Sequence, residues 1–289
     1  MLVKANLVEL PATIDNLSNL HTFRIVGSPL SRLPESIGNL TNLQNLDLGN
    51  NKVSEIPESI GKLTNLQNLE LNENELDIIP NSIGKLKNLQ FLDLSDNNLH
   101  TLPFSFGNLR LTKLNLGYNK FKIFPPEICK VFSLKSLNAS NRFNKIKTRM
   151  ESLPNNIGSL INLEFLSLSD NNFHQIPDSL GNLKNLRHLD MKSNNLTNLP
   201  DSLSGLQSLL HFDLANNKIK DLPDSIGKLK NLRTIDLRNN KLKTLPISLA
   251  TDVEYLTIKL DGNPIEYLPS EFKRYYKFHI EGLFERNWI

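Results

Sequence analysis

A pattern of leucines and one asparagine recurs every 23 residues along nearly the whole chain, and it constrains the fold more than any other feature. Leu46, Leu69 and Leu92, for example, hold the same place in three consecutive copies. Self-similarity at such a period indicates stacked units, because one unit cannot bury its own apolar face. Stacked-repeat proteins generally act through an extended surface, so the pattern favours binding over catalysis in a cleft.

Eleven units can be aligned, and a partial unit precedes them. Their first positions are Leu20, Leu43, Leu66, Leu89, Leu111, Leu134, Leu163, Leu186, Leu209, Leu232 and Tyr255. In the partial unit Leu2, Leu7 and Leu10 keep the spacing, but Ala5 replaces the asparagine. The chain thus opens in mid-repeat, and we expect either a nearly uncapped N-terminal edge or a fragment of a longer protein.

The segment Leu-x-x-Leu-x-Leu of each unit alternates apolar and other residues with a period of two. This alternation predicts a strand with one buried face. We expect Leu46 and Leu48 to point into the core, and Asn45, Asp47 and Gly49 to point outward.

The repeated asparagine follows the last strand leucine by three residues, where the chain must turn. Its side chain can donate to and accept from backbone groups that are otherwise buried without partners. We therefore predict that stacked copies form a hydrogen-bonded ladder of Asn51, Asn74, Asn97, Asn119, Asn171, Asn194, Asn217, Asn240 and Asn263.

A proline-bearing segment, such as residues 33–38, completes each unit. Proline suits the first position of a short helical turn, and glycine suits a helix exit. This return segment is bulkier than the strand, so we expect the stack to bend with its strands on the inner side.

These residues resemble the leucine-rich repeat family, in its 23-residue subclass with the pattern L-P-x-x-I-G-x-L-x-x-L-x-x-L-x-L-x-x-N-x-L. That subclass includes Ras-suppressor-like, plant intracellular Ras-group-related and bacterial proteins. The resemblance implies an α/β fold, a right-handed solenoid in the form of a curved horseshoe. A parallel β-sheet would line its concave face and short helical turns its convex face. It also implies a protein-binding role without choosing the partner.

We expect the solenoid over residues 1–269 and a C-terminal cap over 270–289, because the last segment leaves the pattern and carries many aromatic residues. The repeat is also broken twice further inside the chain. The unit from Leu111 is one residue short, and the next carries an insertion within 138–151 with the basic residues Arg142, Lys145, Lys147 and Arg149. Two interpretations stand: a loop that the solenoid tolerates at small entropic cost, or a basic projection that binds an acidic partner.

Composition excludes several classes of protein. The net charge of +3 is too mild for a typical nucleic-acid binder, and no apolar run is long enough to span a membrane. Cys129 is the only cysteine, and no secretory signal is evident at the N-terminus. We therefore predict a cytoplasmic monomer, or a bacterial effector secreted without a cleaved signal peptide. No motif for phosphate binding, metalloprotease, hydrolase or kinase chemistry is present, so we expect no enzyme activity and no cofactor.

Binding specificity should depend on the residues at outward strand positions, because core packing does not dictate which residues stand there. Three groups stand out: acids on the early strands, aromatic residues near the middle with two lysines, and paired histidines with aspartates on later strands. The candidates are Asp47, Glu70 and Asp93; Phe91, Tyr118 and Phe165 with Lys113 and Lys120; and His188, Asp190, His211 and Asp213.

Exposed aromatic residues are typical interface anchors. Aspartate stripes also serve simply to keep strands solvated, and both interpretations of the acids stay open. Two imidazoles with a carboxylate can hold zinc, but we expect His188 and His211 to be solvated polar residues.

These patterns predict a non-enzymatic module that docks one or more partner proteins on the concave face. The aromatic residues would anchor the partner, and the charged residues with the basic insertion would orient it. The alternative is a bacterial effector, or the sensor region of a larger signalling protein, acting on host or regulatory machinery.

Overall fold

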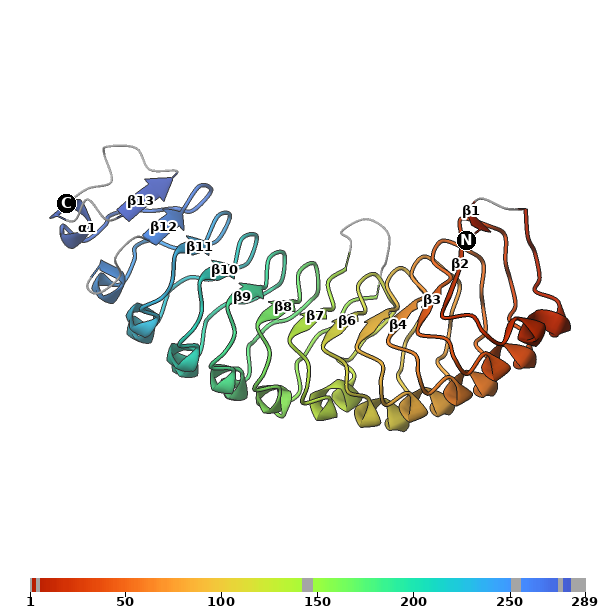
Figure 1. The fold of residues 1–289 in the computed structure, drawn as a ribbon. Coiled ribbons are helices and arrows are strands. Elements are labelled where there is room, and N and C mark those ends of the chain that lie inside the picture. The colour runs from red at the N-terminus through yellow and green to blue at the C-terminus, as the bar shows by residue number, and fades with distance from the viewer. Residues whose placement is uncertain (1, 4–5, 142–147, 251–255, 275–277, 282–289) are drawn as a thin grey trace. The chain divides into compact units, whose positions relative to one another are not determined.

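The structure is a computed structural model, and it describes residues 2–3, 6–141, 148–250, 256–274 and 278–281. The chain divides into two compact units, residues 1–148 (unit 1) and residues 149–289 (unit 2). Both units are built in the same way. Strands line one side and short 3-10 helices line the other (Figure 1).

Unit 1 holds seven strands and six 3-10 helices among its described residues. The strands are β1 (Leu2–Val3), β2 (Thr22–Val26), β3 (Asn45–Asp47), β4 (Asn68–Glu70), β5 (Phe91–Asp93), β6 (Lys113–Asn115) and β7 (Ser136–Asn138). The helices are η1 (Ala12–Leu17), η2 (Glu35–Asn39), η3 (Glu58–Lys62), η4 (Asn81–Lys85), η5 (Phe104–Asn108) and η6 (Pro126–Lys130). Each strand pairs in parallel with the next.

Unit 2 repeats this arrangement and differs only near its end. Its strands are β8 (Phe165–Ser167), β9 (His188–Asp190), β10 (His211–Asp213), β11 (Thr234–Asp236), β12 (Leu256–Lys259) and β13 (Phe278–Glu281). Its helices are η7 (Ile157–Ser159), η8 (Asp178–Asn182), η9 (Asp201–Gly205), η10 (Asp224–Lys228), η11 (Ile247–Ala250) and the α-helix α1 (Glu271–Arg274). These strands are also parallel and consecutive.

The strand pairing confirms the predicted register. Asn45 lies opposite Asn68, which lies opposite Phe91, so residues one repeat apart are neighbours across the sheet. Leu46 and Leu48 are fully buried, as the alternation predicts. Asp47 is half-buried on the opposite face, whereas Gly49 is buried rather than exposed, because Asn72 of the next repeat covers it. Within each unit, the predicted leucine-rich-repeat-like stack, with a parallel sheet on one side and short helical turns on the other, is confirmed.

The asparagine ladder forms as predicted, and it connects neighbouring repeats through their backbones. The Asn97 amide nitrogen donates to the Leu94 carbonyl of its own repeat at 3.1 Å and to the Leu71 carbonyl of the preceding repeat at 2.9 Å. The Asn97 oxygen accepts the Leu76 N–H at 3.0 Å. One side chain thus satisfies several buried backbone groups, which would be costly to leave unpaired.

The prolines and glycines act differently from the prediction. Pro34 precedes η2 in an extended conformation instead of occupying its first position, and its carbonyl accepts the Ile37 N–H at 3.0 Å to close the turn. Gly38 lies inside η2 and does not have a positive φ. A Cβ on Gly38 would lie 2.3 Å from the backbone carbonyl oxygen of Ser59. The glycine is therefore needed for close contact between consecutive turns, not for a helix exit.

Two irregular places interrupt the repeat. Leu109, where the unit is one residue short, is extended with ψ 159, whereas the equivalent Leu86 has ψ 70. A straighter backbone thus spans the gap with one residue fewer. Ala139 is buried at the place of a core leucine. Residues 142–147 of the insertion, including Arg142, Lys145 and Lys147, lie outside the described residues.

The C-terminal segment departs from the turn pattern but continues the sheet. After the buried Leu268, α1 contributes the buried Phe272, and β13 adds a strand parallel to β12. The predicted division into a solenoid over 1–269 and a cap over 270–289 stays a prediction, since residues 282–289 lie outside the described part of the chain.

Candidate functional site

Three rings of unit 2 stand in a row on consecutive strands. Phe165, His188 and His211 occupy paired positions on β8, β9 and β10. The two imidazole rings are stacked, with centroids 4.7 Å apart and an angle of 15° between the planes. The Phe165 ring follows at 6.1 Å from His188 and is tilted. Its side chain is 39% exposed, so the row presents an apolar edge to solvent.

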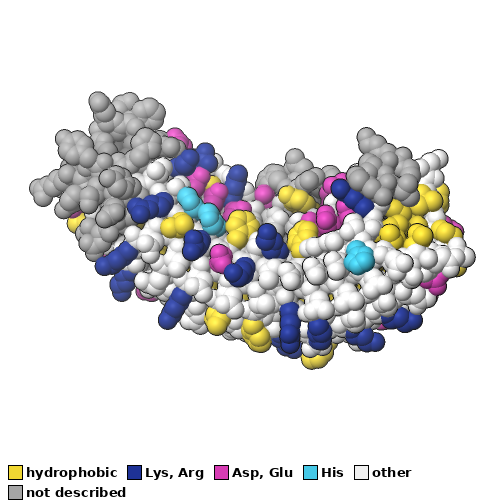
Figure 2. All heavy atoms as spheres, in the orientation of Figure 1, with side chains coloured by type: hydrophobic (Ala, Val, Ile, Leu, Met, Phe, Trp, Pro, Cys, Tyr) yellow, Lys and Arg dark blue, Asp and Glu magenta, His cyan; other side chains and the backbone are white. Residues whose placement is uncertain are grey.

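A row of carboxylates runs beside the rings, because residues two apart on a strand share a face. Asp190, Asp213 and Asp236 occupy paired positions on β9, β10 and β11. Figure 2 shows histidine side chains among acidic and hydrophobic ones on this side of the protein. The strand face of unit 2 therefore combines flat rings with negative charge.

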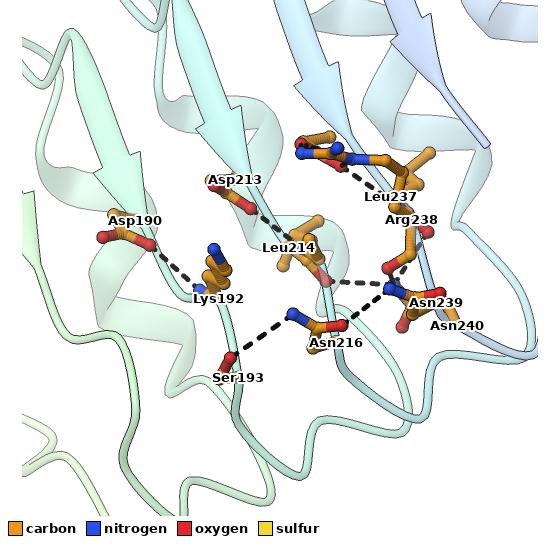
Figure 3. Close-up of polar contacts among 12 residues, drawn as sticks. Asp190, Lys192, Ser193, Asp213, Leu214, Asn216, Leu237, Arg238, Asn239 and Asn240 are labelled. Atoms are coloured by element: carbon orange, nitrogen blue, oxygen red, sulfur yellow. Dashed lines mark hydrogen bonds and ion pairs between the residues drawn. The ribbon is translucent and has the colours of Figure 1, made fainter. Parts of the chain in front are cut away.

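The carboxylates differ in how far their charge is neutralised. Asp236 accepts two bonds from the Arg238 Nε at 2.9 and 3.0 Å and one from Nη2 at 2.6 Å, an interaction that raises the pKa of Arg238. Asp190 accepts the Lys192 N–H at 3.0 Å and the Ser167 hydroxyl at 2.9 Å. Asp213 accepts the Ala215 N–H at 2.9 Å (Figure 3).

Asp213 is the least compensated member of the row. Burial raises the pKa of its carboxyl and the neighbouring carboxylates of Asp236 and Asp190 raise it further, whereas the Ala215 N–H and the charge of Lys192 oppose this rise. In the part of the chain that the structure describes, neither Asp190 nor Asp213 forms an ion pair. Burial also lowers the pKa of His188, with His211 and Arg187 adding to the effect. Added positive charge would therefore be favourable beside Asp190 and Asp213.

The stacked histidines are not arranged as a metal site. Face-to-face rings leave their nitrogens side by side instead of converging on one point, whereas zinc needs ligand atoms about 2 Å away in a tetrahedral arrangement. Among the described residues, no group of three metal-binding side chains comes together.

Unit 1 carries a similar carboxylate row formed by Asp47, Glu70 and Asp93 on β3, β4 and β5. Asp47 forms an ion pair with Arg24 at 2.7 Å. Asp93 accepts from Ser95 and, at 3.1 Å, from the Asn115 amide. Burial and both flanking acids raise the pKa of Glu70, which lies between them. The predicted acidic surface of the early strands thus has its least compensated charge at its centre.

The aromatic candidates of unit 1, Phe91 and Tyr118, lie at different places along their repeats. Phe91 is half-buried on β5 and pairs across the sheet with the exposed Lys113 of β6. Tyr118 lies beyond the end of β6 with φ 62, a conformation that is uncommon for bulky residues. Equivalent places hold Asp96 and Asn216. The backbone conformation at this place does not favour tyrosine, so Tyr118 differs from the equivalent residues only in its side chain.

The remaining candidates are placed as follows. Lys120 is exposed but lies past the strand, where it lines a groove together with Lys122. Arg149 is half-buried, whereas the other three basic candidates of the insertion lie outside the described residues. Cys129 is buried, and burial raises the pKa of its thiol to about 12, which fits a packed residue and not a nucleophile. No helix among the described residues is both long and apolar enough to cross a membrane.

Sequence reasoning missed two features of these surfaces. The ion pair between Asp236 and Arg238 was not anticipated, although an arginine two residues after an aspartate on one strand face is a readable signal. The exposed Phe104 and Ile123 were also missed. Their signal is an apolar residue at places where most other repeats carry a polar one.

Family models for leucine-rich repeats match much of the chain. The description "Leucine-rich repeat region" fits residues 1–75, and "Leucine rich repeat" fits residues 161–219. Paired repeats match over 207–250, and single repeats over 65–86, 88–109 and 110–131. None of the curated proteins compared with the chain matches it.

Solved structures of leucine-rich repeat proteins also resemble this chain. A leucine-rich repeat protein of Leptospira interrogans is 33% identical over 95% of this chain and 75% of its own, with a TM-score of 0.80. The Arabidopsis receptor kinase HAESA, solved with the peptide hormone IDA and a co-receptor, is 30% identical over 93% of this chain and 46% of its own, at a TM-score of 0.74.

InlJ of Listeria monocytogenes, at 20% identity, covers 96% of this chain and 58% of its own with a TM-score of 0.75, and shares the fold alone. The chain thus spans about half the length of the HAESA and InlJ structures. From the matched repeats, the parallel sheet with its asparagine ladder and the likeness to the Leptospira protein, we conclude that the chain belongs to the leucine-rich repeat family.

Proposed function

We propose that this protein is a non-enzymatic protein–protein interaction module whose partner binds the concave strand face. Leucine-rich repeats serve as interaction modules, and the HAESA structure was solved with a peptide bound. The single observation that carries the proposal is the row of Phe165, His188 and His211 beside Asp190 and Asp213.

The chemistry of this row favours a partner that presents an arginine or lysine. A planar guanidinium can stack on an aromatic ring while it donates two parallel hydrogen bonds to a carboxylate. Asp190 and Asp213 lack an ion-pair partner among the described residues, and the rings lie next to them on the same face. The packing of unit 2 does not require two stacked imidazoles at these outward positions.

The other candidates complete the proposal within their own unit. On unit 1, Phe91 and Tyr118 would supply apolar anchors, and Lys113 with the acids Asp47, Glu70 and Asp93 would orient the partner. The basic insertion that contains Arg149 would add contacts to acidic groups. We further propose that the chain belongs to the 23-residue subclass, works as a cytoplasmic monomer, and binds neither nucleic acid nor the membrane interior.

A second candidate function is supported by the solved relatives. RGFR1 and HAESA were solved with peptide hormones, and this chain spans 57% and 46% of those structures. The corresponding proposal is the sensor region of a larger signalling protein, or a bacterial effector exported without a cleaved signal peptide. The two candidates differ in whether a folded protein or a short peptide occupies the strand face.

Site-specific photo-cross-linking tests the proposal directly. A photoreactive residue is placed at Thr234, which neighbours His211 across the sheet, and in a control at the exposed Lys184 on the turn side. After irradiation in native extract, we expect one dominant adduct from position 234 and none of that mass from 184. Adducts from 184 alone, or from neither position, would contradict strand-face binding.

The adduct then separates the two candidate functions. Mass spectrometry identifies it as a folded protein or as a short peptide, and the second result would favour the sensor region. A Phe165→Ala background should abolish the adduct at 234 if the ring row anchors the partner. The Leu17→Ala variant, which truncates an exposed apolar residue of η1, serves as the matched control and should leave the adduct intact.

A further inference from the structure

The largest exposed apolar side chains of unit 1 gather on its turn side, away from the strand face. Phe104 at the start of η5 is 75% exposed, Ile123 before η6 is 69% exposed, and Phe132 after η6 is 57% exposed. All three lie in two consecutive repeats. Figure 2 shows hydrophobic side chains beside lysines and arginines along this edge of the protein.

A groove of about 640 Å³ opens between the same two repeats at the proline corner, where the chain enters the helical turn. We call it the corner groove. Its apolar walls are formed by Leu102, Ile123, Phe124, Pro125 and Pro126, with His100, Lys120, Lys122 and Glu127 also lining it.

Equivalent corners of other repeats are smaller and carry more acidic or amide residues. The corner next to η3 has about 300 Å³, and the acids Glu35, Glu55 and Glu58 line it together with the apolar Ile56 and Ile78. The corner next to η8 in unit 2 has about 370 Å³ and is lined by Gln175, Asp178 and other polar residues. The corner groove is thus the apolar and basic member of a set of places that the repeat itself makes equivalent.

Comparison in register shows that the fold does not require these apolar residues. Ile123 stands two residues before the corner proline, where other repeats carry Glu55, Gln175 or, in one case, the exposed Ile78. Phe104 begins its helix, as Glu58 and Asp178 begin theirs. Solvent-exposed isoleucine and phenylalanine at places that accept carboxylates bring no burial, which marks them as contacts for another molecule.

The charges at the mouth of the groove indicate which molecule fits. Lys120 and Lys122 are exposed there, and Glu127 is the single acid among the lining residues. Outside the groove, the Lys130 ammonium group lies 4.1 Å from the centre of the Phe104 ring. A guest with apolar side chains therefore gains from carboxylates at its flanks, whereas a basic guest is repelled.

We propose that the corner groove docks a segment of a partner polypeptide in which a large apolar side chain is flanked by acidic residues. The apolar side chain lies against Ile123 and Pro126, and the acids lie against Lys120 and Lys122. This site is separate from the strand face, and it requires a guest of opposite charge to the one expected beside Asp190 and Asp213. The protein thus carries two docking surfaces with opposite charge preference.

A random-peptide display library is the probe that tests this proposal. Selection on the whole chain, with counter-selection on Ile123→Gln, should enrich peptides with one large apolar residue between Asp or Glu residues. Individual peptides should lose affinity about tenfold or more on Ile123→Gln and on Lys120→Glu/Lys122→Glu. Glutamine already stands at the equivalent place in Gln175, so the first variant is expected to fold normally, with thermal melting as the check.

Matched controls separate the groove from other surfaces. Ile78→Gln makes the same change in the neighbouring polar corner, and Phe165→Ala alters the strand face, so neither should affect these peptides. If no partner binds the strand face, peptide binding at the corner groove is still expected. The two proposals can therefore fail independently.

Three outcomes would overturn the proposal. No enrichment, or enrichment without acidic residues, contradicts the stated chemistry. Equal loss on Ile78→Gln shows that the groove is not selective. Concentration-dependent dimers in sedimentation that disappear with Ile123→Gln would instead identify a second copy of this chain as the occupant.

Discussion

The strand faces of the two units share one feature and differ in another. Both have a row of three carboxylates on consecutive strands: Asp47, Glu70 and Asp93 in unit 1, and Asp190, Asp213 and Asp236 in unit 2. In each row an arginine pairs with one end, and the pKa of the middle carboxyl is raised. The carboxylate row is thus part of the repeat rather than of one site.

The difference lies two residues earlier on each strand. In unit 1, Asn68 donates to the Asn45 oxygen at 2.6 Å, and Asn45 donates to the Thr22 hydroxyl at 3.3 Å. These polar side chains satisfy one another along the sheet. In unit 2, the same column holds Phe165, His188 and His211, whose rings stack but leave their edges to solvent. Negative charge is thus common to both strand faces, whereas the column of adjacent rings formed by Phe165, His188 and His211 distinguishes unit 2.

The largest expected effect concerns the scaffold that both regions share. Asn97→Ala in unit 1 and Asn194→Ala in unit 2 each leave buried backbone groups without partners. Each loss should lower the free energy of unfolding by about 1–3 kcal/mol, measured by urea denaturation. Unchanged denaturation of both variants would show that water replaces the ladder. A loss in one unit alone would break the structural equivalence of the two.

The next effect concerns binding. Truncating an aromatic anchor should weaken partner binding by about 2 kcal/mol or more. We expect Phe165→Ala, whose ring adjoins the histidine stack, to lose more affinity than Phe91→Ala, whose ring lies half-buried beside Lys113. Titration calorimetry with the cross-linked partner measures both. If neither variant changes affinity, the assignment of these anchors is wrong.

A transplant from one face to the other sharpens the comparison. His188→Asn gives unit 2 the residue that unit 1 carries at the equivalent place in Asn68. Loss of one stacked ring should reduce affinity for an arginine-bearing partner by about 0.5–1 kcal/mol, the size of an exposed cation–π contact. Asn68→His in unit 1 is the reciprocal control and should not create binding, because the new imidazole neighbours Phe91 but has no second imidazole to stack on. Equal affinities for wild type and His188→Asn would remove the histidine from the site.

The smallest effect is a pH dependence of stability that both rows should share. A carboxyl whose pKa is raised by folding favours the protonated form. Its contribution to stability is therefore full below the unfolded pKa of about 4 and is lost as pH rises through the folded value. Asp213→Asn and Glu70→Gln should each shift the denaturation midpoint upward at about pH 7.

That shift should disappear near pH 3 for both variants, where the native carboxyls are protonated. Asp190→Asn is the control, since its side chain accepts two hydrogen bonds as a carboxylate. A shift of the same size at both pH values would assign the effect to packing rather than to charge.

The strand columns were predictable from sequence because a repeat of constant length defines its own neighbours. Residues one period apart must pair across the sheet, so the outward position of Phe165 and the buried position of Leu46 follow directly. The ladder was predictable for the same reason. The roles of Pro34 and Gly38 were predicted wrongly, because propensity rules describe single helices and not the spacing between stacked turns.

Part of the candidate site was also within reach of the sequence. The histidines and aspartates were recognised as neighbours, and their places on one face are confirmed. The stacking of the rings depends on side-chain rotation, which the column order does not specify. The corner groove was not predicted because Ile123 occupies a place where the repeat pattern demands nothing, and only the arrangement of two successive turns brings it into one cavity with Leu102.

The sequence by itself determined the unit, the buried face and the order of side chains along the sheet, because these follow from periodicity alone. The tertiary structure decided how closely successive turns approach, which rings face one another, and which carboxylates form ion pairs among the described residues. Those properties depend on distances of a few ångströms between repeats. Such distances are set by packing across the whole stack and not by the composition of any one repeat.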